Sequence, residues 1–249
     1  IGVLETSQTE KLLPPLIAAL TADQIQGLTA EQIGVLGSQQ TVRLTKSQIT
    51  AFSTAQLAAL DTQISELNPS FISALSAGQI ASLSSGQIGV LTSDQTKSLT
   101  TAQIASLTAD QITHLDPTNL AEMSTLQIRA LTTEQIQALT DNQISALETR
   151  QLANLSTIQV AALTTHQIVT LGTDNIPVLT AAQMSTLSVS QFGALSASQI
   201  TALTTAQAAA LTTLQAAAMT TAQLAGLESQ DLQVIKTSQL NQFSTELID

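Results

Sequence analysis

The chain has 249 residues, of which 43% are hydrophobic, 10% are charged and only 2% are aromatic, and its formal net charge is −11 at pH 7. Seven basic residues over this length form no patch that could follow a phosphate backbone, and no apolar run approaches the roughly 18 residues of a membrane span, so we expect neither nucleic acid as a partner nor insertion into a membrane. The absence of cysteine excludes disulfides and thiolate metal sites.

An eight-residue pattern, LTxxQIxx, runs through the chain. Its leucine position is Leu in 26 of 31 units, and its glutamine position is Gln in 25 of 31. A continuous α-helix is excluded because eight residues turn the apolar stripe about 80° out of register each time. A β-strand is excluded because Ile33 and Leu36 would point to opposite faces. The pattern therefore predicts a helix that starts afresh in every octad.

The first regular octads show how such a helix starts. Residues 11–20 are atypical, since two prolines follow an apolar cap, but from Leu28 onward the pattern is complete. Thr29 is expected at the N-cap and Gln32 at the third helical position, which together form a capping box. Leu28 and Ile33 then flank the cap as a hydrophobic staple. Each helix should be about seven residues long.

The next departure from the pattern lies in residues 61–72. The unit that follows Leu60 is one residue short, and Pro69 and Phe71 replace the usual residues of the next one. The octad then resumes with Ile72. We expect a local kink or change of width here and not a domain boundary.

The octad LTTEQIQAL of residues 131–139 repeats the full signal in the middle of the chain. Thr132 and Gln135 again form a predicted capping box, with Ile136 and Leu139 on the apolar side. Isolated helices shorter than about 12 residues are marginal in water, so stability has to come from stacking. The sequence predicts an all-α solenoid of very short capped helices, whose handedness and number of octads per turn do not follow from the pattern.

A last irregular unit covers residues 172–178, where Pro177 is expected inside the short helix and removes one backbone donor. Despite the three irregular places, the octad runs from end to end. We therefore predict one continuous solenoid over residues 1–249, which is a segment of a longer array and has no solubilising cap at either end.

Glutamine is more constant than capping requires. A capping box accepts glutamate equally well, yet none of the nine glutamates occupies this position. Copying of one repeat would explain this preference as compositional drift. Alternatively, buried amides of adjacent turns form a hydrogen-bonded ladder, in which stacked carboxylates would repel one another.

No group of residues in the sequence predicts catalysis or a cofactor. His114 and His166 stand at different phases of the octad without a second histidine nearby, so both are expected at variable surface positions. Serine and threonine are abundant but are committed to capping. Calcium-binding motifs are missing, and ice binding by a file of exposed threonines is a minor alternative. We expect no catalytic, cofactor-binding or metal-binding residue.

Units such as ALTTAQ, LTTEQIQAL and LTTHQIVTL resemble the octad arrays of very large exported bacterial surface proteins that are labelled haemagglutinin-like or haem utilisation/adhesion proteins. The resemblance implies an exported, surface-associated structural array. It transfers no haem site, because a haem iron needs an axial ligand and the histidines and methionines have no recurring placement.

Two functions fit these observations. The favoured one is a non-enzymatic stalk, fibre or filament segment at the bacterial cell surface or outside the cell, which acts by extension, display and self-association. The alternative is a binding module whose regular face recognises a glycan, a surface or a protein. Positive charges such as Arg43, Lys97 and Arg150 are dispersed and not gathered at one phase of the repeat, which favours the structural role.

Overall fold

The computed structural model describes residues 4–242, and every regular element in that range is a short helix; no strand occurs there. The predicted all-α solenoid is confirmed. The chain divides into two compact units, Ile1–Ala130 and Leu131–Asp249.

The first unit contains fifteen short α-helices and one 3₁₀-helix in the described range. They are α1 (Thr6–Glu10), α2 (Pro14–Ala19), α3 (Ala22–Gln26), α4 (Ala30–Gly34), α5 (Ser38–Thr41), α6 (Lys46–Thr50), α7 (Thr54–Ala59), the 3₁₀-helix η1 (Asp61–Glu66), α8 (Pro69–Ile72), α9 (Ala77–Ala81), α10 (Ser85–Gly89), α11 (Ser93–Ser98), α12 (Thr101–Ser106), α13 (Ala109–His114), α14 (Pro117–Glu122) and α15 (Thr125–Arg129).

The second unit continues with fourteen helices up to residue 242. They are α16 (Thr133–Ala138), α17 (Asp141–Ala146), α18 (Thr149–Asn154), α19 (Thr157–Ala162), α20 (Thr165–Thr170), α21 (Gly172–Asn175), α22 (Ala181–Thr186), α23 (Val189–Gly193), α24 (Ala197–Thr201), α25 (Thr205–Ala210), α26 (Thr213–Ala217), α27 (Thr221–Gly226), α28 (Ser229–Val234) and α29 (Thr237–Leu240).

The helices are shorter than the predicted seven residues, and the backbone at their ends shows why. In the octad of α12, Thr100 has the extended conformation of an N-cap, with φ −75° and ψ 160°, and Leu107 is extended as well, with φ −60° and ψ 141°. Two extended residues in this octad leave six for the helix. The last turn closes with a bond from Leu107 N to Ile104 O at 3.2 Å, which spans three residues as in a 3₁₀ turn.

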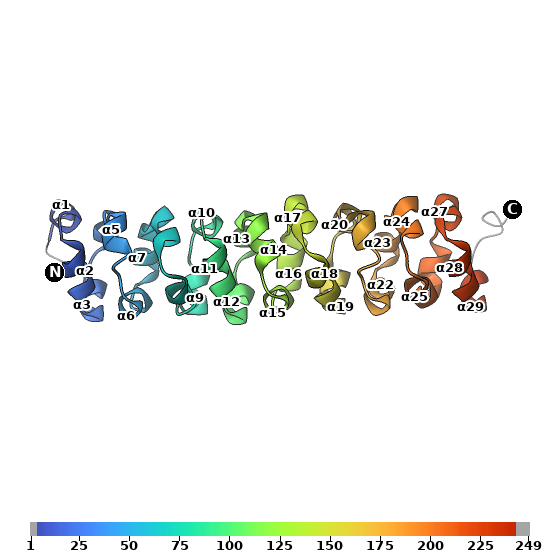
Figure 1. The fold of residues 1–249 in the computed structure, drawn as a ribbon, viewed down its shortest axis with the longest axis horizontal. Helices are drawn as coiled ribbons and strands as arrows, with labels where there is room; N and C mark the ends of the chain where they lie inside the picture. Colours follow the sequence, from blue (N-terminus) through green and yellow to red (C-terminus); the bar gives the residue numbers. More distant parts are fainter. Residues whose placement is uncertain (1–3, 243–249) are drawn as a thin grey trace. The chain divides into compact units, whose positions relative to one another are not determined.

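Within each unit the helices wind as a spiral, and each packs on the helix three places further along (Figure 1). In the first unit α4 packs on α7 and α10 on α13, and in the second α22 packs on α25 and α24 on α27. Side-chain hydrogen bonds described below reach back to the helix four places earlier. One turn of the superhelix therefore takes between three and four octads.

The core of each unit consists of two apolar positions of the octad. The leucine position and the position after glutamine are buried almost throughout, as at Leu107 with 4% exposure and Ile104 with 0%. Side chains of medium size suffice because each turn of short helices encloses a narrow interior. This explains a core in which Phe192 is the largest fully buried side chain.

At residues 61–72 the spiral continues through a 3₁₀-helix in place of an α-helix. Asp61 has a positive φ of 45°, residues Asp61–Glu66 form the 3₁₀-helix η1, and α8 then begins with Pro69 in its first turn. Asn68 caps α8 by accepting from Ser70 N at 2.9 Å. The tighter 3₁₀ winding spans the shortened unit, and Ile64 keeps the buried position with 0% exposure.

The other irregular units lack the side-chain cap. Helix α2 follows Leu13 and starts at Pro14. Helix α21 follows Leu171 and starts at Gly172, whose φ of 72° favours glycine. The prediction that Pro177 lies inside its helix was wrong, because α21 ends at Asn175. Ile176 still has α dihedral angles, with φ −63° and ψ −46°, but Pro177 has no N–H to form the next bond of the helix.

One glycine marks a close approach of two backbones and yields a prediction. A Cβ at Gly226 in α27 would lie 2.8 Å from the Ala197 carbonyl oxygen, whereas a Cβ at Gly193 would meet nothing within 4 Å. We expect Gly226→Ala to lower the free energy of unfolding by about 1–3 kcal/mol. Gly193→Ala should raise it by about 0.5–1 kcal/mol through a less flexible unfolded chain. Equal effects in thermal melting would contradict this packing.

Candidate functional site

The octad of residues 28–36 has the predicted helix start. Thr29 Oγ1 accepts from the backbone N–H of Gln32 at 3.2 Å, and Thr29 N–H donates to Gln32 Oε1 at 2.7 Å. Leu28, Ile33 and Leu36 are all buried. Thus the threonine and the glutamine each satisfy one donor that a helix start leaves free.

The octad of residues 131–139 has the same arrangement. Gln135 N–H donates to Thr132 Oγ1 at 3.2 Å, and Thr132 N–H donates to Gln135 Oε1 at 2.8 Å. Ile136 has 0% exposure and Leu139 has 4%. Their carbonyl oxygens accept hydrogen bonds from Gln167, at 2.9 and 2.8 Å. The second pair of bonds joins this octad to a later turn.

This link between turns recurs along both units, and we call it the glutamine bridge. In the example of Gln103, Oε1 accepts from Thr100 N–H at 2.8 Å, while Nε2 donates to the carbonyls of Ile72 at 2.8 Å and Leu75 at 2.7 Å. The acceptors lie 31 and 28 residues earlier. Both acceptors are recorded for Gln40, Gln48, Gln56, Gln95, Gln103, Gln111, Gln127, Gln167, Gln183, Gln207, Gln215 and Gln223.

The bridge keeps its partners where the sequence is one residue short. Across the short unit, Gln79 donates to Phe52 O, 27 residues earlier, at 2.9 Å. Gln87 donates to Leu57 O, 30 residues earlier, at 2.7 Å. Each separation is one less than in the regular octads. The bridging amide therefore bonds to carbonyl oxygens near the end of the helix in the turn below, even where their separation along the chain changes.

These bonds correct the predicted amide ladder. The amides do not stack on one another as predicted; each bridging amide joins its own N-cap to main-chain carbonyls of the turn below. Glutamine is suited to this position because it accepts with Oε1 and donates with Nε2 at the same time, whereas an ionised glutamate has no donor. These amides are also buried, with 2% of Gln103 and 1% of Gln207 exposed. A buried polar group without a partner would cost free energy, so the position favours a side chain that satisfies both sets of partners.

At the surface, a second set of contacts joins side chains 25 residues apart. Hydrogen bonds or ion pairs join Ser85 with Asp110, Lys97 with Glu122, and Asp141 with His166. The Glu122 carboxylate raises the pKa of the Lys97 ammonium group. Solvent and salt screen exposed pairs of this kind, so they add little to the stability that the buried bridges provide.

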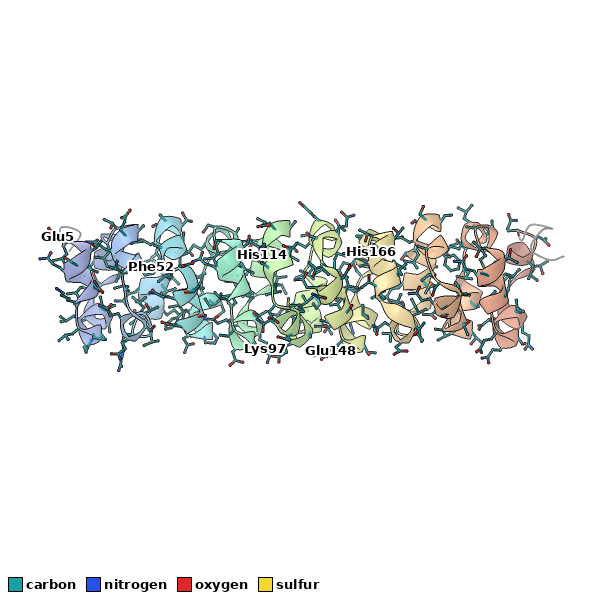
Figure 2. All side chains as sticks on the ribbon, turned by 90° about the horizontal axis from the view of Figure 1, so that it is seen from above. Glu5, Phe52, Lys97, His114, Glu148 and His166 are labelled. Atoms are coloured by element: carbon teal, nitrogen blue, oxygen red, sulfur yellow. The ribbon has the colours of Figure 1, made fainter. Side chains whose placement is uncertain are left out.

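The histidines lie at the surface of their respective units (Figure 2). His166 Nε2 lies 3.0 Å from Asp141 Oδ2, and His114 Nδ1 lies 2.9 Å from the carbonyl oxygen of Asp110. Among residues 4–242, no group of three or more histidine, aspartate or glutamate side chains is arranged to hold a metal ion. Over the same range, no helix combines the length and apolar character that crossing a membrane requires.

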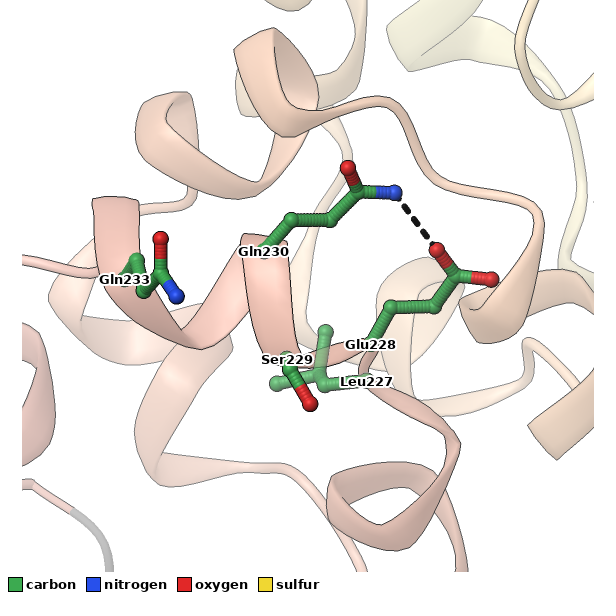
Figure 3. A pocket seen from close by; sticks show the side chains of 5 residues that line it. All are labelled: Leu227, Glu228, Ser229, Gln230 and Gln233. Carbon is green, nitrogen blue, oxygen red and sulfur yellow. Dashed lines mark hydrogen bonds between the residues drawn. The ribbon is translucent and has the colours of Figure 1, made fainter.

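A hollow in the second unit lies beside α28 and is open to solvent. It has a volume of about 610 Å³ and is lined by Leu227, Glu228, Ser229, Gln230 and Gln233 (Figure 3). Gln230 Nε2 donates to Glu228 Oε2 at 2.6 Å. Its lining thus offers one carboxylate that an amide already engages.

A family model described as the ALTTAQ repeat matches residues 72–101, 114–149 and 144–181. The comparison with curated proteins gave no match. The matched segments lie in both units and include the octad of residues 131–139. Together with the all-α fold, this similarity indicates a structural repeat protein.

Proposed function

We propose that the chain is a non-enzymatic structural segment of an exported bacterial surface array, and that it acts as a stalk, fibre or filament by extension and display. The observation that carries the proposal is the glutamine bridge. The most regular polar side chain of the repeat, buried at Gln103 and Gln207, holds one turn on the turn before it. Each added octad therefore extends the spiral.

The surface of the second unit supports self-association as the mode of assembly. Residues 175–227 contain no charged residue. Val189 on α23 is 44% exposed and Leu214 on α26 is 68% exposed, and these two helices pack on each other. Like-charge repulsion and charge solvation, which normally keep surfaces apart, are missing here. A second copy of the chain is the partner that we propose for this surface.

Electron microscopy of the purified chain tests the proposal. We expect elongated particles of constant width that associate into pairs or filaments as the concentration rises. Replacement of Val189 and Leu214 by lysine should leave the particles intact and reduce their association. Compact globules would contradict the extended array, and unchanged association of the double variant would contradict the proposed surface. Antibody labelling of intact cells of the source organism should detect the array, and labelling only after lysis would contradict export.

A further inference from the structure

Helix α28 has an acid where the repeat has glutamine. Asp231 stands at the bridge position with 1% of its surface exposed, and neither of its carboxylate oxygens has a hydrogen-bond partner among residues 4–242. The bridges on either side are intact. Gln223 donates to Leu195 O at 2.8 Å and Gln239 donates to Leu211 O, both 28 residues earlier. A donor at position 231 would by the same register meet the carbonyl oxygen of Leu203.

Asn119 shows that a side chain of this length can make the bridge. In α14 it occupies the same position of the octad, and its Nδ2 donates to Leu91 O, 28 residues earlier, at 2.7 Å. Protonated aspartic acid has the size and shape of asparagine and carries one O–H donor. Ionised aspartate has no donor and would place its charge near a carbonyl oxygen.

We propose that Asp231 is a proton-operated latch: its protonated carboxyl donates to the Leu203 carbonyl and holds α28 on the turn below, and ionisation releases the helix. The latch does not depend on export, display or self-association. In the second unit, acid should therefore stabilise the packing of α28 on the turn below, and neutral pH should weaken this packing.

Few ionisable groups lie on the helices around Asp231. Helices α24, α25 and α27 contain no ionisable side chain, and α28 packs on α25. The N-cap residue Glu228 carries the same charge as Asp231, while Lys236 is the N-cap residue of α29. Burial raises the pKa of Asp231, and the Glu228 carboxylate adds a smaller contribution in the same direction. The nearby backbone N–H of Glu228 offsets part of the effect, although it does not reach hydrogen-bond geometry with the carboxylate.

The sign of the pH dependence follows from this raised pKa. The folded state binds the proton more tightly than the unfolded chain, so the stabilisation is complete below the unfolded pKa of about 3.9. It is lost as the pH rises through the higher pKa of the folded state. Carboxylates that are paired with a positive charge or hydrogen-bonded to N–H groups have lowered pKa values and behave in the opposite way.

Hydrogen exchange of the α28 amides at pH 4 and pH 7 tests the latch. Protection factors, which are corrected for the intrinsic exchange rate, should fall between these pH values, by a factor of about ten for each unit that separates the folded pKa from the unfolded one within this range. Asp231→Asn should keep the donor at both pH values and remove this dependence. Asp231→Gln, which restores the residue of the repeat, should do the same.

Asp174→Asn is the matched control, since it removes one negative charge at an exposed residue of the same unit. It should retain the pH dependence of the unaltered chain. Equal protection of α28 at pH 4 and pH 7 in the unaltered chain would overturn the latch. So would a carboxyl titration of Asp231, followed by NMR, with a midpoint at or below that of Asp174.

Discussion

Gln103→Glu is expected to lower the free energy of unfolding of the first unit by about 3–5 kcal/mol at pH 7, the range measured when a buried charge is left without a partner. The substitution changes one NH₂ group into an oxygen. It removes both donors of the bridge, at 2.8 Å to Ile72 O and 2.7 Å to Leu75 O, and it places a carboxylate beside these two carbonyls. Thermal melting followed by circular dichroism measures the loss.

Local capping alone predicts a different result for this variant. Glutamate also accepts from the N-cap N–H, and a negative charge near a helix N-terminus stabilises by about 0.3–1 kcal/mol. The matched control is Gln24→Glu. Gln24 has the same capping box with Thr21 and is exposed, and no described residue accepts from its amide. The control should be neutral or slightly stabilising, and equal losses in the two variants would contradict the bridge.

The loss in Gln103→Glu should depend on pH. A protonated glutamic acid has one O–H and can restore one of the two bonds, so burial raises its folded pKa above the unfolded value of about 4.3. The difference from the unaltered chain should therefore be smallest below that value and grow as the pH rises through the folded pKa. A difference that is constant from pH 4 to pH 7 would mean that the carboxylate escapes to solvent.

The helix starts could be predicted because their causes are local. Thr29 and Gln32 lie three residues apart, and a capping box needs only that spacing. The apolar positions could be predicted from the octad as well, since Leu28, Ile33 and Leu36 recur at fixed phases. Helix length was overestimated by one residue or more, because the extended conformation of the leucine position depends on the turn that follows it.

The glutamine bridge could not be predicted in full because its acceptors are main-chain atoms. Every residue of the chain has a main-chain oxygen that can accept a hydrogen bond. Nothing in the sequence therefore marks the oxygens of Ile72 and Leu75 as the acceptors. The constancy of glutamine, with no glutamate in its place, indicated that a second interaction exists. The sequence does not give the rise of the spiral. That rise places the Gln103 amide against the main chain of Leu75 and Ile72, which lie 28 and 31 residues earlier.

The glutamine bridge also predicts how each unit should respond to a destabilising substitution. In an octad such as that of Gln103, two bonds from the amide and two buried apolar side chains join the helix to neighbouring turns. Contacts of this range make stability a sum of neighbour terms and not the property of one central core. A defect should then weaken the turns that touch it and leave distant turns of the same unit in place.

Ile136→Ala in α16 should show this local behaviour with a large effect. Ile136 has 0% exposure, and loss of a buried isoleucine side chain costs about 2–5 kcal/mol because a cavity remains. Helix α16 packs on α19, and the Ile136 carbonyl accepts from Gln167 in α20. Hydrogen exchange should therefore accelerate in α16, α19 and α20, while the amides of α24–α27 keep their protection.

Ile158→Ala in α19 is the matched control for the same chemical change. Ile158 is 69% exposed, so its truncation should change stability by less than about 0.5 kcal/mol. Loss of protection in α24–α27 equal to that in α16 would show that the whole unit opens as one block, which would contradict the neighbour model. Loss confined to the contacting helices would show that each turn is stabilised by the turns next to it.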